Sequence, residues 1–148
     1  MTSCCLLIET FVSFTEPAFR NTRDKSERCF GYFFQKKTDF NVFAKDGLTI
    51  DEYINNSNLR HKGIPCKFYH NVRCGIFHNG ETKDGWKIRI DQSILFDEAT
   101  KTIDANIFMD KLKNVIDNFR KELINSDFNN DQIWITYKFR LQDLIDNS

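Results

Sequence analysis

Arg73 and His78 are the residues of this chain whose types and spacing best suit chemistry, and they lie five positions apart. Arginine is always charged and holds phosphate oxygens through two parallel hydrogen bonds. Histidine titrates near neutral pH, so it can take up or release a proton during a reaction. RNA carries its own nucleophile, the 2′-hydroxyl group. A base that removes its proton, with a cation on the developing phosphorane, therefore suffices for cleavage without a metal.

The expected products of such a reaction are a 2′,3′-cyclic phosphate and a 5′-hydroxyl. DNA has no 2′-hydroxyl group and is expected to resist. Because an Arg and a His at this spacing also arise by chance, the spacing alone is weak evidence. The arrangement of the surrounding side chains adds to it.

The segment that carries the pair predicts one helix, which begins at Pro65 and ends at about His78, where Asn79 and Gly80 close it. An α-helix turns by about 100° per residue, which places the apolar side chains of this segment in one arc. This arc is predicted to pack into a core and contains Phe68, Tyr69, Val72, Gly75 and Ile76. Gly75 is expected to let another helix approach closely.

The opposite arc of the same helix is polar and gathers Arg73, His78 and three further side chains, His70, Asn71 and Cys74. We predict that Arg73 and His78 are the catalytic residues. His70, Asn71 and Cys74 are predicted to contact the substrate or a second copy of the chain.

Hydrophobic periodicity and capping residues predict that the rest of the chain is mostly helical. The predicted helices run from Cys4 to near Pro17, from Ser26 to about Lys37, from Pro65 to about His78, from Asp104 to about Leu123 and from Asp131 to about Ile145. Residues 47–63 are predicted to form a loop around one short helical turn at residues 50–54. Alternating apolar residues predict a strand at 86–91, and residues 94–96 and 102–103 predict a hairpin. The fold class is therefore all-α: a bundle of about five helices with a small β-hairpin excursion near residues 86–104.

The composition fits one domain that spans residues 1–148. The chain holds 15 Phe but only 2 Pro and 6 Gly, which favours helices packed on an aromatic core. Its 21 basic and 21 acidic residues cancel, which argues against a protein that coats nucleic acid non-specifically. Any contact with nucleic acid is expected to be local. The basic cluster in residues 20–37 is expected to be a solvated face, which in a ribonuclease would guide RNA phosphates.

The five Cys residues include no pair with zinc-knuckle spacing, and free thiols in a reducing cytosol are expected. No metal site and no cofactor are predicted, since His70 and His78 stand two helical turns apart. His61 is expected at the surface, and Asp127, Asn129 and Asp131 are expected to cap a helix rather than bind calcium. No apolar run approaches the ~18 residues of a membrane span, and a cytoplasmic protein is expected.

The segment Phe68–His78 resembles the signature of the HEPN superfamily, in which an Arg, four to six intervening residues and a His mark many ribonucleases. The resemblance implies an all-α bundle, commonly a homodimer whose two motifs line one cleft. It implies that Arg73 and His78 are catalytic. Known members include toxins of toxin–antitoxin pairs and anti-phage factors, and others have lost catalysis and serve as binding partners. One position departs from the pattern: active members often carry a polar residue after the Arg, frequently Asn, and here it is Cys74.

Three functions follow from these observations. The first is a metal-independent endoribonuclease in toxin–antitoxin or anti-phage defence. Its substrate would be RNA, and its partner an antitoxin or a defence-system protein. The second is a catalytically inactive HEPN-like module that binds RNA, a nucleotide or a partner protein. The third is a helical interaction domain in which Arg73 caps or bridges helices.

Overall fold

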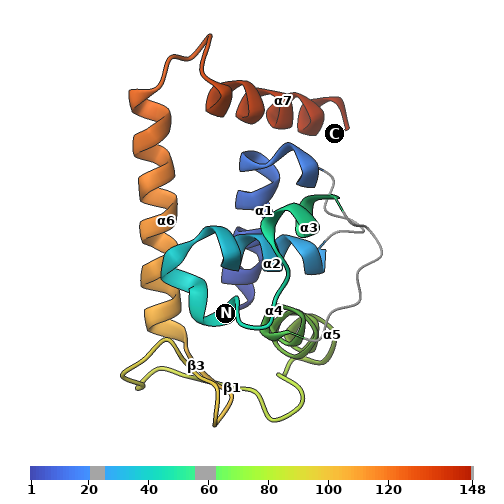
Figure 1. Ribbon diagram of the computed structural model, residues 1–148, viewed down its shortest axis with the longest axis vertical. Helices are drawn as coiled ribbons and strands as arrows, with labels where there is room; N and C mark the ends of the chain where they lie inside the picture. The colour runs from blue at the N-terminus through green and yellow to red at the C-terminus, as the bar shows by residue number, and fades with distance from the viewer. Residues whose placement is uncertain (21–25, 56–62, 148) are drawn as a thin grey trace.

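The structure is a computed structural model that describes residues 1–20, 26–55 and 63–147, which form a helical bundle with a small sheet at one end (Figure 1). The α-helices are α1 (Thr2–Thr15), α2 (Ser26–Lys36), α3 (Ile50–Asn55), α4 (Ile64–Phe68), α5 (Cys74–Asn79), α6 (Ala105–Asn125) and α7 (Gln132–Asp146). Two 3-10 segments, Pro17–Phe19 and Thr38–Phe43, follow α1 and α2. The prediction of an all-α bundle with a small β excursion is confirmed.

The helix predicted from Pro65 to His78 is present as one continuous rod, Ile64–Asn79, which we call the motif helix. It consists of α4, a π-helical turn at Tyr69–Arg73, and α5. The motif helix ends at Gly80, which adopts the left-handed conformation (φ 74°) and donates its N–H to the carbonyl of Ile76 at 3.0 Å. The π turn was not expected. The hydrogen bonds of a π turn join residues i and i+5 rather than i and i+4. The turn therefore rotates the side chains that precede it around the helix axis relative to those that follow it.

The core is aromatic, as the Phe content predicts, and the buried hydrophobic side chains form one cluster. Phe34 of α2 lies near its centre, where its ring is 5.1 Å from that of Phe68 and 5.0 Å from that of Phe43. The rings of Phe68 and Phe108 are stacked at 5.9 Å, which joins the motif helix to α6. Burial of each such side chain contributes about 1.5–3 kcal/mol to stability. The motif helix is thereby fixed to the bundle by its apolar arc.

The predicted hairpin is also present, and a third strand joins it. β2 (Phe96–Asp97) pairs antiparallel with β3 (Thr102–Asp104), and β1 (Lys87–Arg89) pairs parallel with the other edge of β3. Trp86, just before β1, is buried and stacks on Phe96 with ring centroids 5.1 Å apart. It is therefore a core residue and does not offer its face to a base.

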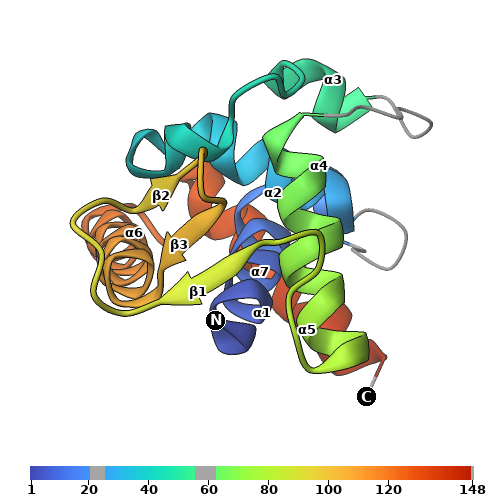
Figure 2. The same ribbon diagram turned by 90° about the horizontal axis from the view of Figure 1, so that it is seen from below.

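The long helix α6 follows β3 directly and begins at the predicted cap. Asp104 accepts a hydrogen bond from the N–H of Ile107 at 2.8 Å through one carboxylate oxygen and from that of Gln92 at 2.8 Å through the other. α6 spans the length of the bundle, and α7 crosses its far end over α1 (Figure 1). Seen from below, the motif helix lies beside the sheet, at the opposite end of the molecule from α7 (Figure 2).

The apolar side chains predicted on α7 are only partly covered. The Trp134 ring nitrogen donates to the carbonyl of Leu123 at 2.9 Å, which ties the start of α7 to the end of α6. Leu141, Leu144 and Ile145 are exposed. α7 is thus held at its start by Trp134 and near its end by the ion pair of Asp143 with Arg20.

Candidate functional site

Arg73 stands at the end of the π turn and faces α1, where it forms a two-bonded ion pair with Glu9. Its Nε donates to Oε1 of Glu9 at 2.9 Å, and its Nη2 donates to Oε2 at 3.3 Å. The side chains are 18% and 12% exposed, so the pair is largely shielded from water. Burial acts to lower the pKa of Arg73, but the hydrogen bonds and charge of Glu9 outweigh it and the pKa is raised overall. Arg73 is therefore a fixed cation that bridges the motif helix and α1.

Two aromatic rings complete the surroundings of the Arg73 guanidinium. Its central carbon lies 4.5 Å from the ring centroid of Phe77 and 5.7 Å from that of Tyr69. A guanidinium group carries five N–H donors, and Glu9 engages only the Nε–Nη2 edge. The donors on the Nη1 side are not used by Glu9, and they form the part of Arg73 suited to meet a phosphate.

His78 is exposed in the last turn of α5. Counted through α5 at about 100° per residue, it lies about 140° around the helix axis from Arg73. The two side chains thus stand at opposite edges of the polar arc. One copy of the chain does not aim both of them along a common direction.

The other three predicted site residues have different neighbours. His70 turns toward α2, where its Nε2 is 3.1 Å from Oε2 of Glu27. The main-chain carbonyl of Asn71 accepts a hydrogen bond from the N–H of Lys83 at 2.8 Å. His70 lies within the π turn and its imidazole meets Glu27 of α2, whereas Arg73 at the end of the same turn meets Glu9 of α1.

Cys74 lies next to Tyr69 and is partly buried. Burial raises the pKa of Tyr69 to about 12, and a hydrogen bond with the Cys74 thiol adds to the shift. The Tyr69 hydroxyl therefore stays protonated at neutral pH. The roles of His70, Asn71 and Cys74 toward RNA remain predictions.

Gly75 allows a close approach, but not by another helix as expected. A Cβ atom at this position would lie 2.6 Å from the carbonyl oxygen of Glu81. The neighbour is thus the loop that follows the motif helix, which folds back across its apolar arc. The hydrogen bond from Lys83 to Asn71 holds that loop in place.

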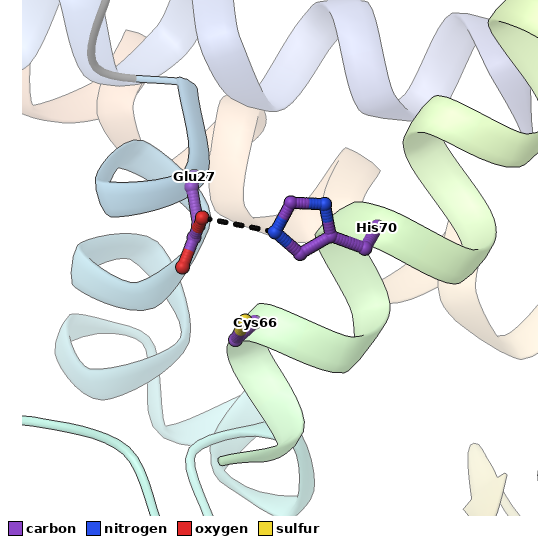
Figure 3. Close-up of side chains that lie close together, drawn as sticks. All are labelled: Glu27, Cys66 and His70. Atoms are coloured by element: carbon purple, nitrogen blue, oxygen red, sulfur yellow. Dashed lines mark hydrogen bonds and ion pairs between the residues drawn. The ribbon is translucent and has the colours of Figure 1, made fainter. Parts of the chain in front are cut away.

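A second group of chemically active side chains lies on the other side of the motif helix. Glu27, Cys66 and His70 each bring one potential metal-ligating atom, and these atoms lie within 4.8 Å of one another (Figure 3). This group was not predicted, because His70 was paired only with His78 in the sequence. Cys66 and His70 are four residues apart, which puts both on one helix face and was visible in the sequence. Glu27 was not identifiable as their partner, because it lies on a different helix.

Much of the basic cluster predicted as a solvated face has structural roles. Arg28 is buried and donates to the carbonyls of Tyr53 at 2.7 Å and Ile54 at 2.6 Å, which stabilises the end of α3. Arg20 pairs with Asp143, with Nε donating to Oδ2 at 2.6 Å. Arg23, Lys25 and His61 lie outside the described residues.

A surface hollow of about 260 Å³ is formed between α1, α2, α6 and α7, and its lining includes Tyr32, Lys37 and Glu122 but neither Arg73 nor His78. All five Cys residues are free thiols, as expected. In residues 1–20, 26–55 and 63–147, no helix combines the length and apolarity that a membrane crossing requires.

Comparison with known proteins found no match to this chain among the protein-family models, the curated proteins or the solved structures.

Proposed function

We propose that this protein is a metal-independent endoribonuclease of the HEPN type, in which Arg73 stabilises the transition state and His78 transfers a proton. The observation that carries the proposal is the contrast between the two residues. Arg73 is held rigidly by Glu9, whereas His78 is exposed at the end of the same helix. A fixed cation and an accessible imidazole are the two groups that cleavage through the 2′-hydroxyl requires.

In this reaction, His78 removes the proton of the 2′-hydroxyl group, and the oxygen attacks the adjacent phosphorus. The bond from phosphorus to the 5′-oxygen then breaks, that oxygen takes up a proton from water, and His78 releases its proton to solvent. Arg73 stabilises the negative charge that develops on the phosphorane oxygens through its Nη1 side. Because Glu9 already fixes the guanidinium, little side-chain entropy is lost when the phosphate binds.

A homodimer supplies both groups to one phosphate. Arg73 and His78 lie about 140° apart around the helix axis, so the Arg of one copy and the His of the other are better placed to converge. In a symmetric dimer the same composite site occurs twice. This arrangement agrees with the paired motifs that the resemblance to the HEPN superfamily implies.

The biological setting we propose is toxin–antitoxin or anti-phage defence in the cytoplasm, with an antitoxin or another defence-system protein as partner. This setting rests on the resemblance of Phe68–His78 to the HEPN signature alone. A ribonuclease that needs no metal requires another form of control, and a bound inhibitor protein would provide it.

The proposal is tested by incubating the purified protein with labelled RNA in EDTA, beside Arg73→Lys and His78→Ala. We expect the wild type to cleave, and His78→Ala to lose about 10²–10⁴-fold in rate. Arg73→Lys keeps the charge but loses the planar, two-bonded contact, and a loss of at least about tenfold is expected. Equal rates in all three proteins would refute the proposal.

The ion pair between Arg73 and Glu9 also favours a second candidate, a catalytically inactive module in which Arg73 serves to bridge α1 and the motif helix. In that case the wild type binds RNA or a partner protein without cleaving RNA. Arg73→Lys would then alter stability only, and His78→Ala would alter neither stability nor binding.

A further inference from the structure

Glu27, Cys66 and His70 form a compact group between two helices that the proposed ribonuclease does not use. Cys66 and His70 stand one turn apart on the motif helix, and Glu27 faces them from the first turn of α2 (Figure 3). The His70 Nε2 is 3.1 Å from Oε2 of Glu27, and the Cys66 thiol hydrogen-bonds to the same carboxylate. The three potential ligating atoms lie within 4.8 Å of one another.

The types of these side chains select among metals. A thiolate, an imidazole and a carboxylate together suit Zn²⁺, whereas Mg²⁺ and Ca²⁺ prefer oxygen ligands alone. With zinc–ligand bonds of about 2.0–2.3 Å in a tetrahedron, neighbouring ligating atoms lie about 3.3–3.8 Å apart. The group therefore needs to contract by at most about 1.5 Å, which rotation about side-chain bonds can supply.

We propose that Glu27, Cys66 and His70 bind a zinc ion, with the fourth coordination position open to water. Three protein ligands with one open position is an established zinc arrangement. The bound ion would cross-link α2 to the motif helix.

The neighbouring residues support such a site. The ring of Tyr69 contacts that of His70 edge-on, with centroids 5.1 Å apart, and so restricts the orientation of the imidazole. The Glu27 side chain is 27% exposed and that of His70 is 56% exposed, so an ion can enter from the His70 side.

The hydrogen bond of Cys66 to Glu27 marks the place that the ion would take. The Cys66 thiol donates its proton to the Glu27 carboxylate, and a bound cation would take the position of that proton. Zn²⁺ replaces that proton, because a coordinating thiol is deprotonated.

The zinc site does not depend on the ribonuclease proposal. His70 faces α2, whereas Arg73 faces α1, so the ion would lie on a different side of the motif helix from the proposed catalytic cation. Its role would be to stabilise the docking of this helix. Cleavage in chelator and zinc binding are thus separate measurements, and either can fail without the other.

The test is a titration of the full-length, reduced protein with Co²⁺ as a spectroscopic probe, followed by displacement with Zn²⁺. The expected result is one equivalent of bound Co²⁺ with a thiolate-to-cobalt charge-transfer band, which Zn²⁺ abolishes. Cys66→Ser should eliminate the band, and His70→Ala and Glu27→Gln should each weaken binding by at least about tenfold. His70 is exposed, so His70→Ala is expected to fold even if Cys66→Ser does not.

The motif helix offers matched controls of the same residue types. Cys74→Ser and His78→Ala lie outside the group and should leave the band and the affinity unchanged. Absence of the band in the wild type would overturn the proposal. A band that survives Cys66→Ser, or binding that is weakened equally by the control substitutions, would overturn it as well.

Discussion

The guanidinium of Arg73 and the carboxylate of Glu9 join the motif helix to α1 through two hydrogen bonds, the shorter of which is 2.9 Å. The ion pair has two consequences for Arg73. The guanidinium is held in one orientation, and Glu9 balances part of its charge before any phosphate binds. Substitution of the acidic partner therefore separates the structural role of Arg73 from its proposed role in RNA binding.

Glu9→Gln keeps the size of the side chain and removes its charge. The free energy of unfolding should fall by about 1–2 kcal/mol, because charge-assisted hydrogen bonds in a largely buried pair are weakened. RNA affinity should rise, since a negative charge beside the phosphate site is removed. Urea denaturation and RNA titration measure the two effects.

Asp143→Asn is the matched control for Glu9→Gln. Asp143 of α7 pairs with Arg20, which follows the 3-10 segment Pro17–Phe19, and these side chains are 28% and 40% exposed. α7 lies at the opposite end of the molecule from the motif helix (Figure 1). We expect a smaller loss of stability and no change in RNA affinity. An RNA affinity that falls in Glu9→Gln would contradict the assignment of Arg73 as the phosphate ligand.

Gly75→Ala tests the packing of the loop after the motif helix. The added methyl group would lie 2.6 Å from the carbonyl oxygen of Glu81, so the loop has to move. The free energy of unfolding should fall by about 1–3 kcal/mol. Gly80→Ala serves as the comparison, because a Cβ atom at Gly80 would meet no atom within 4 Å. Its only cost, about 1 kcal/mol of unfolding free energy, comes from the left-handed backbone. A smaller effect at Gly75 than at Gly80 would contradict the close contact.

Asp104→Asn tests the cap that connects β3 to α6. Hydrogen bonds from the N–H groups of Ile107 and Gln92 hold the pKa of Asp104 below its usual value. Because the folded pKa is depressed, the stabilisation is complete above the unfolded value of about 3.9 and is lost as the pH falls through the folded value. Asn retains one acceptor and cannot receive both bonds.

The wild type should therefore be more stable than Asp104→Asn at pH 7, and the difference should shrink below about pH 4. Chemical denaturation at both pH values measures it. Other carboxyl groups titrate in both proteins and cancel in the comparison. A difference in stability that is constant with pH would show that the carboxylate charge does not contribute.

Mixing of two impaired variants tests whether two copies share the active site. Arg73→Lys and His78→Ala are each expected to have at least about tenfold lower activity as homodimers. A mixed dimer contains one composite site with an unaltered Arg from one copy and an unaltered His from the other. After equilibration of equal amounts, roughly a quarter of the wild-type rate should return. No recovery in a sample shown to contain mixed dimers would place both residues in one copy.

Local patterns were sufficient to predict most of the secondary structure. Three signals depend only on neighbouring residues: the Asp104 cap, the helix end at Gly80 and the alternation near Trp86. The structure begins α6, ends the motif helix and forms β1 at these places. The buried apolar arc of the motif helix likewise follows from its periodicity. Parallel pairing of β1 with β3 was not predicted, because β1 precedes the hairpin and pairs with its second strand rather than with the nearer strand β2.

The candidate site was less predictable, because its partners come from distant parts of the chain. In the sequence, Glu9 is only a charged residue that ends the apolar run before it. No sequence pattern connects it with Arg73, its partner in the structure. The π turn at Tyr69–Arg73 was not predicted, and His70 within it meets Glu27, whereas Arg73 meets Glu9. Helical projection therefore identified the helix and its apolar arc, but not the partners of its polar side chains.

The central claim, that the exposed imidazole of His78 cleaves RNA through the 2′-hydroxyl, is tested most directly by analysis of the RNA ends produced in EDTA. The account predicts that the wild type yields a 2′,3′-cyclic phosphate and a 5′-hydroxyl, and leaves uncut an RNA with 2′-deoxy sugars at the cleaved positions. His78→Ala should cut at least about 10²-fold more slowly while melting at an unchanged temperature, since an exposed side chain is removed. The same end groups produced at the same rate by His78→Ala would contradict the account.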